Sequence, residues 1–301
     1  MNQPVVPYGL AVCYSGYREN QSPHAHAYPT DEQVLEDLRI LEGRFKYIRM
    51  YDTSEHAKSV LRVISKHSIK LKVMLGTEPG GEISNPTCPW GGLHSPEEIA
   101  YNKVHNFAKM DELILLANAY PDIVFAVSVG NESTSSWHSN LMSPERIAEF
   151  VRYVKPRVKC FVTFCEGANY YREHGQVIGD AVDFLSIHSY PVWNKVPFAE
   201  AVQATIEDYE ETKKVFPNKP IIFTEFGWPT SANDRMNKEE TNETNQALYL
   251  KEMEKWSKKN KVLMFIFEAF DEPWKGGNDP VEPEKHWGIY SVDRKPKKFS
   301  L

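Results

Sequence analysis

Short apolar runs alternate with amphipathic stretches along most of the chain. The runs are rich in β-branched and aromatic residues and are bounded by Gly, Pro or polar residues, which is typical of buried strands. Between them, apolar residues recur at helical spacing. The pattern predicts strands at residues 9–14, 47–51, 71–76, 123–132, 158–165, 184–188, 221–225 and 262–267.

Helix start signals precede several of the amphipathic stretches. Thr30 and Ser95 stand at N-cap positions, and Ser143 is followed by Pro144 at the first helical position. After Gly276 no clear amphipathic stretch follows. We therefore expect a short or irregular eighth helix, after helices at residues 31–41, 57–67, 95–119, 143–154, 170–178, 198–216 and 239–259.

Eight strand units follow one another without a linker or a break in composition. An open parallel sheet would leave two unpaired edges, whereas a barrel leaves none. The sequence predicts an α/β protein that is a single (β/α)8 TIM barrel spanning residues 1–301.

Two of the predicted strands deliver a glutamate at their carboxyl ends. KPIIFTEFGWP carries Glu225, and IVFAVSVGNE carries Asn131 and Glu132. A single glutamate at such a position can equally cap the next helix. Two of them at one face of a barrel suggest acid, base or nucleophile chemistry.

Composition excludes several other classes of function. The 301 residues include 35 basic and 41 acidic side chains, for a net charge of −6, and the basic run at residues 295–298 is short, so we expect no nucleic acid partner. No segment approaches the roughly 18 apolar residues that span a bilayer, so no membrane association is expected. No glycine-rich nucleotide loop occurs and no cofactor is expected. His24 and His26 have no third ligand nearby, and we expect no metal site.

The remaining strand ends carry acids and aromatic residues but few lysines. Sugars suit such a surface because their hydroxyls bind carboxylates and their ring faces stack on flat side chains. Trp137, Trp193, Trp228 and Trp274 are candidate stacking residues, although a single tryptophan is more often part of a core.

Six ordered motifs resemble the signatures of glycoside hydrolase family 17, and they span nearly the whole chain. They are RMYD, SVGNE, IHSYP, TEFGWP, FEAFDEPWK and EKHWG, beginning at residues 49, 128, 187, 224, 267 and 284. The bacterial members of that family are the most similar. The resemblance implies a (β/α)8 barrel that cleaves β-1,3-glucan, such as laminarin, with retention of configuration.

By this resemblance Glu225 is the nucleophile and Glu132 the general acid/base, with carboxyl groups about 5 to 5.5 Å apart. Asn131 is expected to bind the sugar 2-hydroxyl, and Tyr190 to donate a hydrogen bond to Glu225. Glu268 and Lys275 are expected to bind hydroxyls or orient Glu225, the alternative being a buried salt bridge between Glu268 and Arg49. The full set of expected substrate-binding residues is Tyr14, Arg49, Tyr51, Asn131, His188, Tyr190, Trp228, Glu268, Trp274 and Lys275.

Several alternatives remain open at this point. A transglycosylase would use the same two glutamates and pass the glucosyl unit to another sugar, and a catalytically silent glucan-binding barrel would use neither. Endo or exo mode is not determined. We expect a monomer that is extracellular or periplasmic after removal of a leader, since the substrate is a polymer, but a cytoplasmic location stays open.

Overall fold

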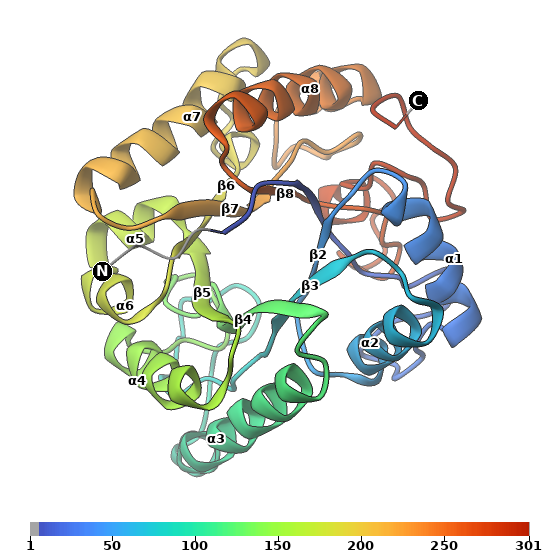
Figure 1. Cartoon of the computed structure of the whole chain (residues 1–301). Coiled ribbons are helices and arrows are strands. Elements are labelled where there is room, and N and C mark those ends of the chain that lie inside the picture. The colour runs from blue at the N-terminus through green and yellow to red at the C-terminus, as the bar shows by residue number, and fades with distance from the viewer. Residues whose placement is uncertain (1–5, 301) are drawn as a thin grey trace.

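A closed barrel of eight parallel strands forms the centre of the computed structural model, which describes residues 6–300 (Figure 1). Each strand pairs with its neighbours in sequence, and β1 closes the ring against β8. The predicted fold is confirmed. The strands are β1 (Leu10–Cys13), β2 (Tyr47–Met50), β3 (Lys72–Gly76), β4 (Val124–Asn131), β5 (Phe161–Gly167), β6 (Leu185–Ser189), β7 (Ile221–Phe226) and β8 (Met264–Ile266).

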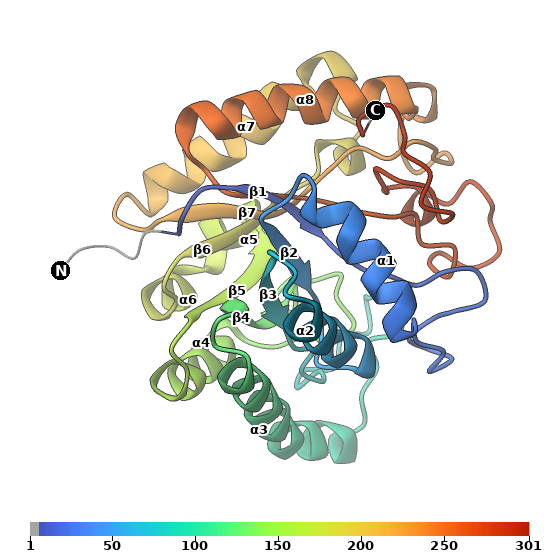
Figure 2. The same ribbon diagram turned by 45° about the vertical axis from the view of Figure 1, so that its right-hand side comes forward.

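Helices surround the barrel and cover its outer face (Figures 1 and 2). The side chains of Thr30, Ser95 and Ser143 accept hydrogen bonds from backbone amides of the first turn, as their positions predicted. The α-helices are α1 (Asp31–Glu42), α2 (Glu55–His67), α3 (Pro96–Ala119), α4 (Pro144–Val154), α5 (Ala168–His174), α6 (Gln176–Ala181), α7 (Phe198–Val215) and α8 (Glu243–Asn260).

The succession of one helix after each strand is broken twice. Two short helices, α5 and α6, follow β5, and among the described residues β8 is followed only by the short 3₁₀ turn η4 (Pro283–Lys285). This confirms the expected irregularity of the eighth helix. In its place the C-terminal segment lies between α8 and α1, as both views show (Figures 1 and 2).

Strand register shifts occur close to the carboxyl ends of the barrel strands. They fall between Ser128 and Asn131 where β4 meets β5, and between Ile187 and His188 where β6 meets β7. Such irregularities re-aim side chains at the rims of barrels. They place Asn131 and His188 at the face where the active sites of TIM barrels lie.

A close backbone approach joins the ends of β7 and β8. Any side chain at Gly227 would collide with the carbonyl oxygen of Phe267. Glycine is therefore required directly after the strand that carries Glu225. None of the described helices is both long and apolar enough to cross a membrane.

Candidate active site

Glu225 lies on β7 with its carboxylate held from three sides. Arg49 donates to Oε1 at 2.5 Å and Tyr51 donates to the same oxygen at 2.9 Å. Tyr190 donates to Oε2 at 2.7 Å, which confirms the hydrogen bond expected from the sequence. The side chain is buried, so these donors replace the water that an exposed carboxylate would bind.

Arg49 lies on β2 and connects β7, which carries Glu225, with the end of β4, which precedes Glu132. Its Nη1 donates to Glu225, and its Nη2 donates to Asn131 Oδ1 at 2.5 Å. The guanidinium stacks over the ring of Tyr51, 4.3 Å from its centroid. Arg49 thus pairs with Glu225 and not with Glu268, and its burial makes it a positioning residue for the site.

Glu132 follows the last residue of β4 and adopts a left-handed backbone conformation, with φ of 53°. Its amide donates to the carbonyl of Cys165 on β5 at 2.8 Å, and its own carbonyl accepts from Ser135 at 3.1 Å. Positive φ is uncommon for a residue with a side chain, and it turns the chain sharply at the strand end. The side chain of Glu132 keeps 18% of its surface exposed, against 6% for Glu225.

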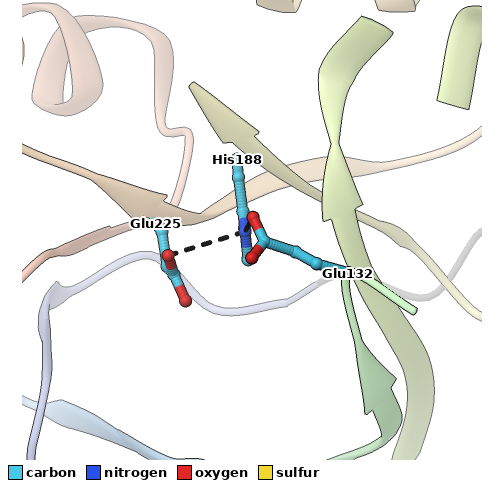
Figure 3. A group of neighbouring side chains, drawn as sticks. All are labelled: Glu132, His188 and Glu225. Carbon is cyan, nitrogen blue, oxygen red and sulfur yellow. Dashed lines mark hydrogen bonds and ion pairs between the residues drawn. The ribbon is translucent and has the colours of Figure 1, made fainter. Parts of the chain in front are cut away.

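His188 on β6 lies between the two carboxylates (Figure 3). Its Nδ1 is 2.8 Å from Glu132 Oε1 and 3.5 Å from Glu225 Oε2. One oxygen of each glutamate lies within 4.8 Å of the other. This proximity matches the separation of retaining glycosidases, about 5 to 5.5 Å, and is well below the roughly 6.5 to 9.5 Å of inverting ones.

The electrostatics of the site favour an ionised Glu225. Burial alone would raise its pKa, but His188, Arg49 and the hydrogen bonds from Tyr190 and Arg49 outweigh burial and lower it to about 2. For His188, burial acts to lower the pKa, whereas the Glu225 and Glu132 carboxylates raise it to about 10. A positive charge on His188 therefore lies between two carboxylates.

The donor set of Glu132, His188 and Glu225 has the composition of a metal site, since three ligand atoms lie within 4.8 Å of one another. The contacts fit proton transfer better. Glu225 already accepts hydrogen bonds on both oxygens, and the cationic Arg49 lies against one of them. A divalent cation would have to displace these donors and share the cavity with a buried guanidinium.

A second ionic cluster lies at the end of β8. Lys275 forms ion pairs with Glu268, at 3.3 Å, and with Glu272, whose Oε1 also accepts from Trp274 Nε1 at 2.9 Å. Burial and the Glu272 carboxylate hold the pKa of Glu268 well above its ordinary value. Glu268 is 1% exposed and lies behind Lys275, whereas Lys275 and Trp274 are partly exposed.

The structure places Tyr14 and Trp228 outside the site, and their prediction as substrate contacts is wrong. Tyr14 points outward, away from the barrel interior, and its hydroxyl donates to Asp37 on the surrounding helix α1 at 3.0 Å. Trp228 packs against Phe198 and Tyr249 and donates to the Glu240 carbonyl at 3.0 Å. Both side chains are 0% exposed.

Three acids near the site are missing from the set of catalytic and substrate-binding residues expected from the sequence, although the sequence indicates Glu166 as a strand-end acid of a loop or subsite. Glu272 anchors Lys275 and Trp274, as described above. Burial raises the pKa of Glu284, the charge of Lys275 acts to lower it, and the charges of Glu225 and Glu132 raise it further. Glu166 accepts from Thr134, Ser135 and the Gly167 amide, and so holds the turn that follows Glu132. Glu272 and Glu284 lie within the matched motifs FEAFDEPWK and EKHWG, and this is the signal that could have found them.

The family model of the BtgE/BtgC glycoside hydrolase domain matches residues 11–288. The chain belongs to this family. The match covers all eight strands, apart from the first residue of β1, and both glutamates, and it agrees with the resemblance to glycoside hydrolase family 17. The protein is therefore a glycoside hydrolase by family.

Two fungal proteins are similar to this chain over most of its length. A glucan 1,3-beta-glucosidase of Arthroderma benhamiae is 25% identical over 278 residues, covering 87% of this chain and 82% of that protein. A probable beta-glucosidase btgE of Emericella nidulans is 26% identical over 268 residues, covering 85% of this chain but 43% of the relative. The chain thus matches most of the first protein and less than half of the second.

Solved structures share the fold at lower identity. An endo-laminarinase from Formosa Hel1_33_131 has a TM-score of 0.83 at 23% identity, covering 96% of this chain and 85% of that chain. A glycoside hydrolase family 17 beta-1,3-glucanosyltransferase from Rhizomucor miehei has a TM-score of 0.74 at 21% identity, with 96% and 95% covered. These likenesses establish the barrel.

Proposed function

We propose that this protein hydrolyses β-1,3-glucosidic bonds of a laminarin-like glucan by a double-displacement mechanism. The observation that carries the proposal is the separation of Glu132 and Glu225, whose nearest oxygens lie within 4.8 Å. That gap leaves no room for a water between base and sugar, so the second carboxylate attacks directly. The names of the fungal relatives support glucan as the substrate.

In the first step, Glu225 attacks the anomeric carbon and forms a covalent glycosyl ester. The low pKa of Glu225, about 2, keeps the nucleophile ionised. At the same time Glu132 gives a proton to the leaving glycosidic oxygen. Among the described contacts, Glu132 Oε2 accepts only one hydrogen bond, a long one of 3.5 Å from Asn131 Nδ2. This oxygen is therefore free to carry the proton that Glu132 donates.

In the second step, Glu132 takes a proton from an incoming water, which breaks the ester and restores Glu225. His188 supports both steps because its Nδ1 contacts Glu132 Oε1 and can share a proton with it. Asn131 has its Oδ1 fixed by Arg49, and its Nδ2 makes only the long contact to Glu132 Oε2, so it keeps a donor for the sugar 2-hydroxyl. A hydrogen bond at this hydroxyl strengthens in the transition state.

Glucanosyl transfer is the second candidate, because the same covalent intermediate serves it. A sugar hydroxyl in place of water, deprotonated by the same Glu132, would extend the acceptor chain. The partly exposed aromatic rings Trp137, Trp193 and Trp274 favour sugar acceptors near the mouth.

The test is to follow laminari-oligosaccharide cleavage by proton NMR and to separate the products by size over time. Hydrolysis with retention gives shorter products that first emerge as the β-anomer, whereas products longer than the substrate identify transfer. Fresh product as the α-anomer would overturn the mechanism. A Glu225→Gln variant that keeps full activity on laminarin would overturn the residue assignment, and a wild type that binds laminarin without cleaving it would identify a silent glucan-binding barrel.

We further propose that the protein acts as a monomer. We also propose that it acts outside the cytoplasm, because the proposed substrate is a polymer. Size-exclusion chromatography with light scattering tests the first point, and fractionation of source cells with an antibody tests the second. A dimeric mass or a purely cytoplasmic signal would contradict the respective proposal.

A further inference from the structure

The loop that connects β3 to α3 reaches far from its own strand. Asn85 in this loop donates to the carbonyls of Ser136 and His138 in the loop after β4, at 2.6 and 3.1 Å. Cys88 donates to the carbonyl of Trp137 at 3.0 Å. The two loops are thereby joined into one wall beside Glu132, and the wall carries Trp90 near its tip.

Arg235 connects this wall to the opposite side of the barrel. Its guanidinium lies over the Trp90 ring, 5.3 Å from the centroid, and over the Trp193 ring at 4.8 Å. Its Nη1 also donates to Glu282 Oε1 at 2.5 Å. Loops that follow β3, β6, β7 and β8 therefore meet at one arginine side chain.

A continuous series of ring contacts leads from the nucleophile to this arginine. Tyr190, which donates to Glu225, has its ring 5.1 Å from that of Trp287. Trp287 in turn lies 6.3 Å from Trp193, the ring under Arg235. Trp90 thus stands at the outer end of an aromatic path that begins at the catalytic carboxylate.

Trp90 is 61% exposed, although its position in the loop is fixed by the contacts just described. A large apolar ring held in water next to a cation gains little from folding, since most of its surface stays hydrated. The exposed indole is instead suited to the apolar face of a pyranose. We propose that Trp90, backed by Arg235 and Trp193, forms a remote subsite that binds a glucosyl ring of the glucan chain.

This inference rests on the proposed function and extends it to substrate length. Trp287 in this path is buried, so a ligand that reaches Trp90 must extend over the surface between the catalytic centre and Arg235, and only longer chains gain from the contact. The enzyme is then expected to prefer long oligosaccharides. Arg235 acts as a positioning residue, because its guanidinium lies over both indoles and so fixes Trp90 relative to Trp193.

The experiment measures kcat/KM of the wild type and of Trp90→Ala across laminaritriose to laminariheptaose. We expect the variant to lose about tenfold on laminariheptaose, mainly through KM, and to be unchanged on the shortest cleaved substrate. Trp90→Tyr keeps a flat ring and should recover most of the loss. Leu93→Ala, an exposed residue of the same loop, is the matched control and should behave as wild type.

A binding measurement separates affinity from turnover. Laminariheptaose titrated into the Glu225→Gln variant should quench its tryptophan fluorescence. In the double variant that also carries Trp90→Ala, binding should be about tenfold weaker while the melting temperature is unchanged. Equal length dependence in wild type and Trp90→Ala overturns the subsite and leaves the hydrolase standing. A wild type that neither cleaves nor binds laminari-oligosaccharides overturns the proposed function and the subsite with it.

Discussion

Two buried carboxylates, Asp37 and Glu225, are both held by arginine, yet their surroundings differ in one respect. Asp37 accepts hydrogen bonds from Arg294, Arg18 and Tyr14, all of them groups that keep their protons. Glu225 accepts from a similar set but also adjoins His188, which contacts a second carboxylate. Asp37, whose partners all keep their protons, only stabilises the fold. Glu225 lies beside a histidine that shares a proton with a second carboxylate, so its surroundings can support proton transfer.

The largest expected effect comes from removing the charge that does chemistry. Glu225→Gln should lower kcat/KM on laminarin by about 10⁴-fold or more, because the nucleophile is lost, while the amide oxygen still accepts from Arg49 and Tyr51. Urea unfolding should also show a loss of stability, because the buried Arg49 loses its counter-charge in the same way as the arginines of the Asp37 variant below. The loss of kcat in the folded fraction separates the two sites, and a folded Glu225→Gln fraction that retains kcat would reverse the comparison.

The next effect concerns stability alone. Asp37→Asn leaves Arg294 and Arg18 without their shared counter-charge, so we expect the free energy of unfolding to fall by about 3 to 5 kcal/mol. The kcat of the folded fraction should stay unchanged. Glu36→Gln is the matched control, because Glu36 pairs with Arg18 at the surface with its side chain 61% exposed, where a pair contributes about 0 to 1 kcal/mol.

The shared proton predicts a pH dependence. With a pKa of about 10, His188 keeps its proton through neutral pH and loses it only as the pH rises toward that value. Glu225, with a pKa of about 2, stays ionised down to strongly acidic pH. Wild-type activity should therefore persist at neutral and mildly alkaline pH, where the pair of His188 and Glu132 still holds a proton.

His188→Asn should move the alkaline limb of the kcat profile to lower pH, with a loss of about ten- to a hundredfold at pH 8 and less at pH 5. His138→Asn is the control, since His138 lies in the loop after β4 and donates no hydrogen bond to Glu132 among the described contacts. An unchanged profile for His188→Asn would show that the ring has a packing role only.

The smallest effect sharpens the comparison at the level of one hydrogen bond. Tyr190→Phe removes a donor to Glu225 Oε2, and we expect kcat to fall about tenfold, which corresponds to the lower end, about 1.5 kcal/mol, of what a hydrogen bond to a charged group contributes. Tyr14→Phe removes the corresponding donor to Asp37 and should alter only the unfolding midpoint. Steady-state kinetics and urea titrations on both variants measure the difference, and a loss of kcat in Tyr14→Phe would contradict it.

The barrel and the catalytic pair could be predicted because they depend on local pattern. A strand such as β7 is an apolar run with breakers after it, and the carboxyl ends of parallel strands meet at one face. Tyr14 could not be placed in this way. Cys13 pairs in register with the inward-facing Arg49, so the next side chain points outward, and that register follows from packing of the whole ring.

Other misses have the same kind of cause. Trp228 lies beyond the strand end, where the close approach of Gly227 to Phe267 turns the chain and sends the indole under Glu240. Glu284 lies in the short 3₁₀ turn η4, within a stretch after β8 that has no helical or strand periodicity. The contact between the Trp90 ring and the Arg235 guanidinium joins two loops that lie far apart in the sequence. No local sequence pattern predicts such a contact.

The C-terminal segment that replaces the eighth helix bears on the order of events during synthesis. Arg294, which donates to Asp37, lies 257 positions further along the chain, and β1 pairs with β8 only after almost the whole barrel has been synthesised. On the ribosome, the N-terminal half therefore emerges with Asp37 paired only to Arg18 and Tyr14, and with the edge of β1 that faces β8 unpaired. We expect the nascent barrel to need protection from aggregation until the segment around Arg294 has left the exit tunnel.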